Sequence, residues 1–501
     1  MLDKASLEKR IAKARADRGV HQHRLNRFYD FCVPYRVQVG SKAKQAAPSS
    51  SKQDDLFDKE IQIAVNDFAA DHADYFFPDY KPWVKTKAGT AVVPSRLERQ
   101  FAGDLAKWEE RLYDLIRATD FYEQVHEVLI DVAGAAGGMN IAYQPRNRPV
   151  RCQPILMANL LFDEGPFNDL DGRWQEFWVR KGDLANVFPG VPITDQKIKT
   201  MRDADYVSVI QGIVREWPEG KAPLWHWMLM IGEQFTIKPL LQDEPPPINV
   251  GRWRHAPPSA WGPGPADLAL AAGQTLDELA LLNLKKLGKE ADPPFSYEVD
   301  GVFNPAAGVN AGDYVGRRQG SQPPAPLYEP TNSQNLYFDR ETLKMTVKRA
   351  LYQDSPFQRG DTPPTATQWM SEEAQKQRRA RVRRRVYREF VLPTLQRFAW
   401  LFAVRGELEP LRLDGKDVGV EFVSPLSKAS DAEEVSSGVQ FLGSAIQIFG
   451  ETALASVDAE KTMTNWKKKL GDTTVEIVPP DQQASLIQKI LSAGRNLVNN
   501  G

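Results

Sequence analysis

Apolar residues recur at intervals of three or four along the first third of the chain, and this spacing predicts amphipathic helices. The pattern covers residues 3–32, 56–76 and 96–135. Residues 40–55 separate the first two helices and are mostly small and polar, which is typical of a flexible linker. The sequence GAAGG at 134–138 is expected to stop the third helix and form a turn rather than to bind phosphate.

Between residues 139 and 251 the apolar period changes toward two, which predicts strands. The candidate strands are residues 140–144, 151–156, 174–180, 207–217 and 225–238. We expect these strands to form an antiparallel β subdomain between helical flanks. This arrangement gives an α+β fold that is mainly helical.

The helical period returns in the second half of the chain, where it predicts helices over 265–290, 335–353 and 365–405. Prolines and glycines are frequent between these helices. They predict a small β element on loops over 291–334 and a loop over 353–364.

Local signals mark the ends of these helices. Pro265 suits a first helical turn, because its missing N–H would have no intrahelical partner there. Thr365 and Gln368 have the spacing of a capping box, which satisfies two free backbone N–H groups. Pro393 lies inside the last helix and is expected to kink it.

The composition excludes several classes of protein. The 64 Lys+Arg and 65 Asp+Glu give a formal charge of −1, which argues against a protein that grips nucleic acid over its whole surface. A local basic patch is compatible with this charge. With 42% hydrophobic and 26% charged residues, the chain is neither mostly disordered nor fibrous.

The sequence also indicates a cytosolic place of synthesis. Cys32 and Cys152 are too few for a disulfide scaffold, and we expect two reduced thiols. No apolar run reaches the ~18 residues of a membrane span. The charged N-terminal sequence lacks the apolar core of a signal peptide.

Standard catalytic signatures are missing from the sequence. It contains no GxxxxGK[ST], GxGxxG, GxSxG or HExxH motif. His21 and His23 are close together but lack the partners that a metal site needs. No acidic pair stands out by its spacing, so a carboxylate-based enzyme site is not predicted, although dispersed acids leave it open.

The helix predicted over 265–290 has an unusually wide apolar surface. At 100° per residue its leucines spread over roughly 200°, about twice the stripe of an ordinary surface helix. A narrow polar strip remains, made by Asp267, Glu278, Lys285 and Lys289. Such a helix is either the centre of a monomeric core or is packed between neighbours in a ring, with its polar strip facing a lumen.

The sequence KQRRARVRRRVYR at 376–388 is strongly basic. On a helix, Val382, Val386 and Phe390 share one face and the arginines cover the rest. These arginines either pair with acidic neighbours or contact DNA phosphates or an acidic partner.

Several segments occur in an order that points to one family. They are LFDKEIQIAVNDFAADHADYFFPDYKPW (56–83), WRHAPPSAWGPGPADLALAAGQTLDELALLNL (253–284), TATQWMSEEAQ (365–375) and FVSPLSKASDAEEV (422–435). Taken in order, they resemble the portal proteins, or head-to-tail connectors, of short-tailed (podovirus-type) bacteriophages. Gln368 stands where the Thr-Ala-Thr-Glu helix start of that family has an acid.

The resemblance implies a dodecameric ring at one capsid vertex, with wing, stem, clip and crown regions around a DNA channel. Carried over by position, the regions are the wing 1–258, first stem helix 259–290, clip 291–334, second stem helix 335–352, tunnel loop 353–364, long wing helix 365–405 and crown 406–501. In the ring reading, Asp267, Glu278, Lys285 and Lys289 would face the channel.

The resemblance also implies which residues meet partners. In the tunnel loop, Phe357, Gln358 and Arg359 would lie nearest the DNA. In the clip, subunit and partner contacts would come from Phe295, Tyr297, Val302, Phe303 and Tyr314. The implied partners are other copies of the chain, double-stranded DNA, the terminase motor, a tail adaptor, and capsid and scaffolding proteins.

No cofactor, metal, membrane or catalytic activity is implied, and the expected location is the virion, after synthesis in the host bacterial cytoplasm. A near-neutral chain suits this role, because a ring multiplies every lining charge and a strongly basic lumen would hold the DNA. Two alternatives remain at this point. One is a virion or scaffold-like interaction protein without a channel, and the other is a metal-dependent nucleic-acid enzyme.

Overall fold

A computed structural model of the chain forms two compact units, which are described separately. Unit 1 comprises Met1–Pro82 and Ala106–Pro410, and unit 2 comprises Trp83–Leu105 and Leu411–Gly501. The structure describes residues 3–36, 55–80, 82–88, 98–143, 150–218, 220, 222–241, 244–257, 259–291, 295–296, 319–320, 325–326, 334–353, 383–409, 412–413, 416–417, 420–423, 435, 437–439, 441–444, 462–463 and 466.

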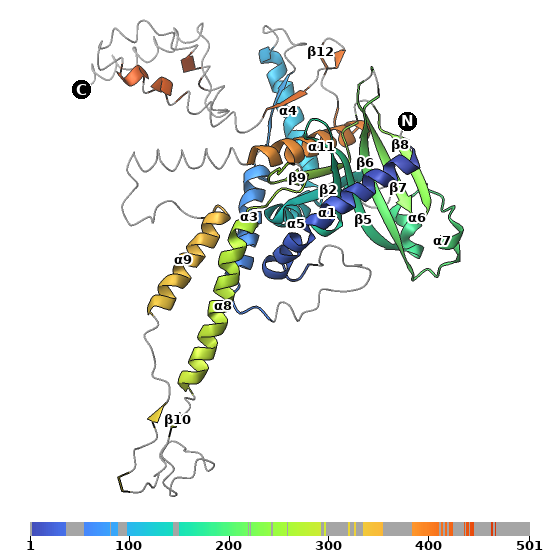
Figure 1. Ribbon diagram of the computed structural model, residues 1–501. Coiled ribbons are helices and arrows are strands. Elements are labelled where there is room, and N and C mark those ends of the chain that lie inside the picture. Colours follow the sequence, from blue (N-terminus) through green and yellow to red (C-terminus); the bar gives the residue numbers. More distant parts are fainter. Residues whose placement is uncertain are drawn as a thin grey trace, which may run out of the picture. The chain divides into compact units, whose positions relative to one another are not determined.

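The N-terminal helices of unit 1 follow the predicted pattern closely (Figure 1). They are α1 (Lys4–Cys32) and α3 (Glu60–Phe76). Asp3 caps α1, because its carboxylate accepts a hydrogen bond of 3.0 Å from the backbone N–H of Ser6. The N-terminal helical prediction is therefore confirmed.

The single helix predicted over 96–135 is wrong in one respect, because the structure divides it. Helix α4 spans Glu98–Arg117 and α5 spans Phe121–Gly134. The hydroxyl of Thr119 donates to the carbonyl of Ile116 (2.7 Å) and accepts from the N–H of Phe121 (3.2 Å). The first contact closes one helix and the second begins the next.

Among the described residues, unit 1 has two antiparallel sheets of three or more strands, and all candidate strands belong to them. The larger sheet has the order β4-β5-β6-β7-β8 and the smaller has the order β3-β2-β9. The strands are β2 (Ala136–Tyr143), β3 (Val150–Ile155), β4 (Leu160–Glu164), β5 (Leu170–Arg180), β6 (Tyr206–Glu216), β7 (Leu224–Ile231), β8 (Gln234–Pro239) and β9 (Ile248–Arg252). Short helical segments connect them: η1 (Met157–Asn159), η2 (Lys181–Asp183), α6 (Leu184–Val187) and α7 (Gln196–Thr200).

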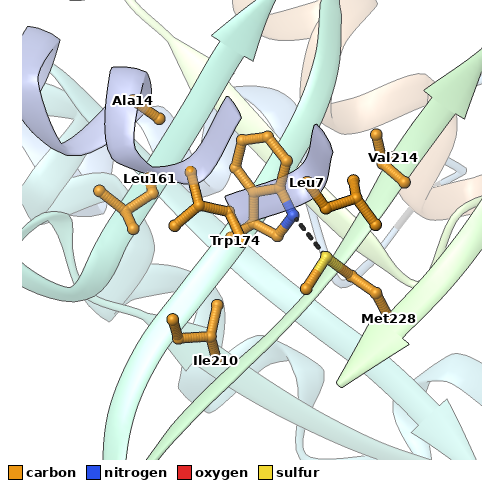
Figure 2. Packing of buried hydrophobic residues seen from close by; sticks show 8 residues of the cluster. Leu7, Ala14, Leu161, Trp174, Ile210, Val214 and Met228 are labelled. Atoms are coloured by element: carbon orange, nitrogen blue, oxygen red, sulfur yellow. Dashed lines mark hydrogen bonds between the residues drawn. The ribbon is translucent and has the colours of Figure 1, made fainter. Parts of the chain in front are cut away.

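A hydrophobic core lies between α1 and one face of the five-stranded sheet (Figure 2). Trp174 is fully buried at its centre, and its Nε1 donates to the sulfur of Met228 at 3.1 Å. Glycines on the strands make room for the ring. A Cβ at Gly172 or Gly212 would lie 2.0 or 2.3 Å from indole atoms of Trp174.

The C-terminal part of unit 1 continues as helix. A π-helical turn, η4 (Tyr387–Val391), leads into α11 (Leu392–Val404). This π-helical turn ends two residues before Pro393, the residue where a kink is predicted. An α-helical bond to Pro393 would use the carbonyl of Glu389, but proline has no N–H to donate. The first part of the predicted helix, 365–382, lies outside the described residues.

Unit 2 contributes small antiparallel pairs. Strand β1 (Lys85–Ala88) pairs with β14 (Val420–Val423), and β12 (Arg412–Leu413) pairs with β13 (Lys416–Asp417).

Candidate functional site: the α8–α9 helix pair

Two helices of unit 1 coincide with the helices predicted over 265–290 and 335–353. Helix α8 spans Ala266–Ala291, about 39 Å at 1.5 Å per residue, and α9 spans Gln334–Ala350. They pack against each other side by side (Figure 1). The four residues proposed for the channel-facing strip lie on α8, and the proposed clip residues come between α8 and α9 in the sequence.

Close backbone contacts in the turn before α8 explain why residues 262 and 264 of the sequence Gly-Pro-Gly-Pro (262–265) are glycines. A Cβ at Gly262 would lie 2.0 Å from the carbonyl oxygen of Arg254, and one at Gly264 would lie 2.2 Å from that of Ala133. Distances this short are not compatible with any side chain. The glycines therefore let the chain approach two other backbone segments closely, and α8 starts from that fixed point.

Asp267 secures the first turn of α8. Its carboxylate accepts hydrogen bonds from the Gly264 N–H at 3.1 Å and from Arg24 of α1 at 2.8 Å. Burial raises the pKa of the Asp267 carboxyl, and the Arg24 guanidinium opposes that shift. Within a single chain, this member of the predicted polar strip is thus bound to α1.

The first half of α8 is held to α1 and α3 by further polar contacts. Arg27 donates to Gln274 at 2.6 Å. One carboxylate oxygen of Asp277 accepts from the backbone N–H groups of Phe57 (2.6 Å) and Asp58 (2.9 Å), directly before α3 begins. Most apolar positions of this half are buried, whereas Leu268 is 62% exposed; the buried ones include Ala266, Ala269, Leu270, Ala272 and Leu276.

Helix α9 is tied to α3 by charge. Arg340 contacts Asp58 at 3.1 Å, and Glu60 lies 3.7 Å from Lys344 and 3.3 Å from Lys348. These three cations lie on one side of the helix, because they are spaced at four residues. Contacts from α1 and α3 thus fix one end of the helix pair.

The second half of α8 is exposed in the single chain. Leu282, Leu284 and Leu287 are 53%, 54% and 50% exposed. Glu278, Lys285 and Lys289 are exposed as well. By helical geometry these three charges fall within roughly 40° of one another, so they share one strip. The charges Glu278, Lys285 and Lys289 and these three leucines therefore lie on the same half of the helix.

The other predicted contact residues are only partly described. In the clip region, β10 (Phe295–Ser296) pairs with β11 (Ala325–Pro326), which agrees with the predicted small β element and places Phe295 on a strand. The remaining clip and tunnel candidates lie outside the described residues: Tyr297, Val302, Phe303, Tyr314, Phe357, Gln358 and Arg359.

The described part of the basic run makes contacts within the chain. Arg385 pairs with Glu389 at 2.8 Å, and Arg388 lies 3.5 Å from Asp169. The guanidinium of Arg383 lies 4.3 Å from the ring centre of Tyr75. For these arginines, pairing with neighbours is the observed role.

Sequence reasoning missed the anchoring residues of the helix pair. Arg24 is 243 positions from Asp267, and Arg340 is 282 positions from Asp58. No local spacing could reveal such partners. The only available signal was the excess of charged residues on the predicted helices over 3–32 and 335–353.

The described residues offer no evident site for a metal. They contain no group of three or more His, Cys, Asp or Glu side chains that could hold an ion. Cys32 and Cys152 are free and buried, and burial raises the pKa of both thiols. None of the described helices combines the length and apolar character needed to cross a membrane.

Comparison with solved structures finds chains of gene transfer agent (GTA) particles. A chain from the neck of an empty GTA particle is 13% identical with a TM-score of 0.37, covering 86% of this chain and 96% of its own. A chain from a native GTA virion is 11% identical with a TM-score of 0.38, and the match covers 92% of this chain and 99% of that chain. A chain from the neck of a native GTA particle is 14% identical with a TM-score of 0.36, and the match covers 88% of this chain and 97% of that chain.

Comparison by sequence family gives a match over nearly the whole chain. No curated protein matches the chain. The family model of the bacteriophage head to tail connecting protein matches residues 4–475. The chain therefore belongs to the bacteriophage head-to-tail connecting protein family, which is structural rather than enzymatic.

Proposed function

We propose that this connector is a portal protein, which forms a closed ring of about twelve copies at one capsid vertex. Double-stranded DNA would pass through the ring during packaging and ejection. The terminase motor and a tail adaptor would dock on the clip, and the tunnel loop with Phe357, Gln358 and Arg359 would lie nearest the DNA. The connector family itself places the protein at the head–tail neck of a phage-like particle.

The observation that carries the proposal is the pair of exposed apolar sides on α8. Leu282 and Leu284 are each about half exposed, and by helical geometry they lie roughly 200° apart, on opposite sides of the helix. A closed ring needs head-to-tail contacts, in which each copy offers two different surfaces. A helix with apolar residues on opposite sides meets that requirement.

Native mass spectrometry of the purified protein tests the ring. A ring of twelve copies has a mass of 12 × 56.4 ≈ 677 kDa. Burying the exposed half of one leucine contributes about 1 kcal/mol, and each subunit interface would gain from two leucines. We therefore expect Leu282→Asn/Leu284→Asn to shift the protein toward small species.

Leu241→Asn is the matched control, because Leu241 is 69% exposed and lies outside α8. This variant should form rings as the wild type does. Rings of unchanged mass in the double variant would place the subunit contact elsewhere. A wild-type protein that stays monomeric even with capsid and scaffolding proteins present would refute the portal proposal.

A further inference from the structure

A cavity opens between the two sheets of unit 1, and none of its lining residues belongs to α8 or α9. Its volume is about 310 Å³, at the lower end of the range for ligand sites. Strands β2 and β3 line it on one side, and β6, β7 and β8 line it on the other. Residues 187–191 close a third side.

Several polar side chains at this cavity have no partner among the residues that the structure describes. They are Asn140, Arg151, Gln153, Gln211 and Lys238. Among the described residues, none of these side chains makes a hydrogen bond or an ion pair. Asn140 is only 6% exposed, and its buried Oδ1 has no partner. Buried amide groups are nearly always hydrogen-bonded, so this arrangement fits a site that is completed by a bound molecule.

Two basic residues of α1, the helix that covers the larger sheet, behave differently. Arg10 pairs with Asp163 at 2.9 Å, and Arg15 pairs with Glu176 at 2.8 Å. Among the described residues that line the cavity none is acidic, so none of them compensates the charges of Arg151 and Lys238. The cavity therefore carries the positive charges of Arg151 and Lys238, whereas Arg10 and Arg15 on α1 are neutralised by their acidic partners.

The remaining wall of the cavity is apolar. Trp227 from β7 and Phe188, Pro189 and Val191 from the connecting segment contribute to it. Tyr143 stands at the cavity with 53% of its surface exposed, and the guanidinium of Arg405 lies 5.1 Å from its ring centre. An aromatic and aliphatic wall favours a bulky apolar group in the ligand.

We propose that this cavity binds a short extended segment of another protein, in which an acidic side chain neighbours a bulky apolar one. Arg151 and Lys238 would bind the carboxylate. Carboxamides both donate and accept, as peptide groups do, so Asn140 and Gln211 suit the backbone of the segment. A free inorganic anion would leave the apolar wall in water. The site is independent of ring closure and goes beyond the connector role.

The test is selection from a random heptapeptide library with the full-length protein, followed by affinity measurement on the resynthesised peptides. We expect enrichment of Asp or Glu beside Leu, Phe or Trp. Arg151→Gln/Lys238→Gln and Asn140→Leu should each weaken binding at least tenfold, and replacing the acid by its amide in the peptide should do the same. Lys199→Gln, an exposed lysine outside the cavity, is the control and should bind normally.

Specific results would overturn the proposal. They are the absence of enriched peptides, enrichment without an acid, or equal binding by all variants. The double variant changes only exposed side chains, so it keeps the test valid if Asn140→Leu unfolds. If Asn140→Leu instead reduces self-association at an unchanged melting temperature, the occupant is a second copy of the chain and not another protein.

Discussion

Asp131 is fully buried in α5, and replacing it by asparagine should destabilise unit 1. One of its oxygens accepts from Arg36 at 2.5 Å and from the Tyr29 hydroxyl at 3.3 Å. The other accepts from the Met157 N–H at 2.7 Å. The carboxylate thus joins the end of the N-terminal segment, α5 and the connection after β3.

The loss of stability expected for Asp131→Asn follows from the charge of the buried Arg36, which loses this partner. The Arg36 side chain is 5% exposed, and it also pairs with Glu127, whose side chain is 46% exposed. Burial alone would lower the pKa of Arg36, but Asp131, Tyr29 and Glu127 together raise it, so Arg36 stays charged. Removing one partner of a buried pair costs about 3–5 kcal/mol. We expect about 3 kcal/mol, because Glu127 remains as a partner.

Native-state hydrogen exchange is the suitable assay, since a chain of two units need not unfold in one step. A loss of 3 kcal/mol corresponds to exchange faster by about 100-fold in α1 and α5, at 1.4 kcal/mol per factor of ten. In Arg36→Met/Asp131→Asn the uncompensated charge is gone, so exchange should be slower than in the single variant. The reasoning would be refuted if exchange in Asp131→Asn were less than tenfold faster than in the wild type. It would also be refuted if exchange in the double variant were as fast as in the single variant.

Two further predictions concern the start of α8. Gly264→Ala should destabilise unit 1 by about 1–3 kcal/mol or more in thermal unfolding, because the new Cβ meets a backbone oxygen. Gly288→Ala, with open space at its Cβ, should be neutral or stabilising by up to about 1 kcal/mol. The raised pKa of Asp267 means that the folded state binds its proton more tightly than the unfolded state. The contribution of Asp267 to stability is therefore greatest below the ordinary carboxyl pKa and decreases as the pH rises through the raised pKa of the folded state. In Asp267→Asn, the melting temperature should decrease less over this pH range than in the wild type.

Helices α1 and α3 could be predicted from sequence because their burial is one-sided. The same reasoning missed β9, a strand of five residues in which the polar Asn249 and Arg252 are buried like the apolar positions. It also missed β4, whose apolar residues are consecutive. Periodicity detects a strand that has one solvent-exposed face, whereas β9 and most of β4 are buried on both faces.

The candidate site likewise has a part that could be predicted from the sequence and a part that could not. Spacing alone placed Glu278, Lys285 and Lys289 on one strip, and the structure leaves all three exposed. Spacing also placed Asp267 there, but its carboxylate is bound to Arg24, whose position in the fold depends on how α1 packs. Local periodicity identifies a helix face, whereas the partner on that face comes from a distant part of the chain.

This difference changes the charge that a channel would present. With Asp267 bound to Arg24, the exposed strip carries Glu278, Lys285 and Lys289, a net charge of −1 + 2 = +1 per chain. In the proposed ring the strip would carry about one positive charge per subunit. That charge would hold DNA in a salt-dependent way, because each neutralised phosphate contributes about 0.9 to the slope of log K against log salt.

Lys289→Gln makes the strip neutral and so tests whether it faces DNA. If it does, short duplexes should bind variant rings more weakly than wild-type rings at low salt. The slope of log K against log salt should also become shallower by about 0.9 for each lost phosphate contact. Lys199→Gln removes the same charge from a residue outside the helix pair and should leave the slope unchanged. An unchanged slope in Lys289→Gln rings of normal mass would mean that the strip faces another subunit or solvent, and the channel lining would then have to come from other residues.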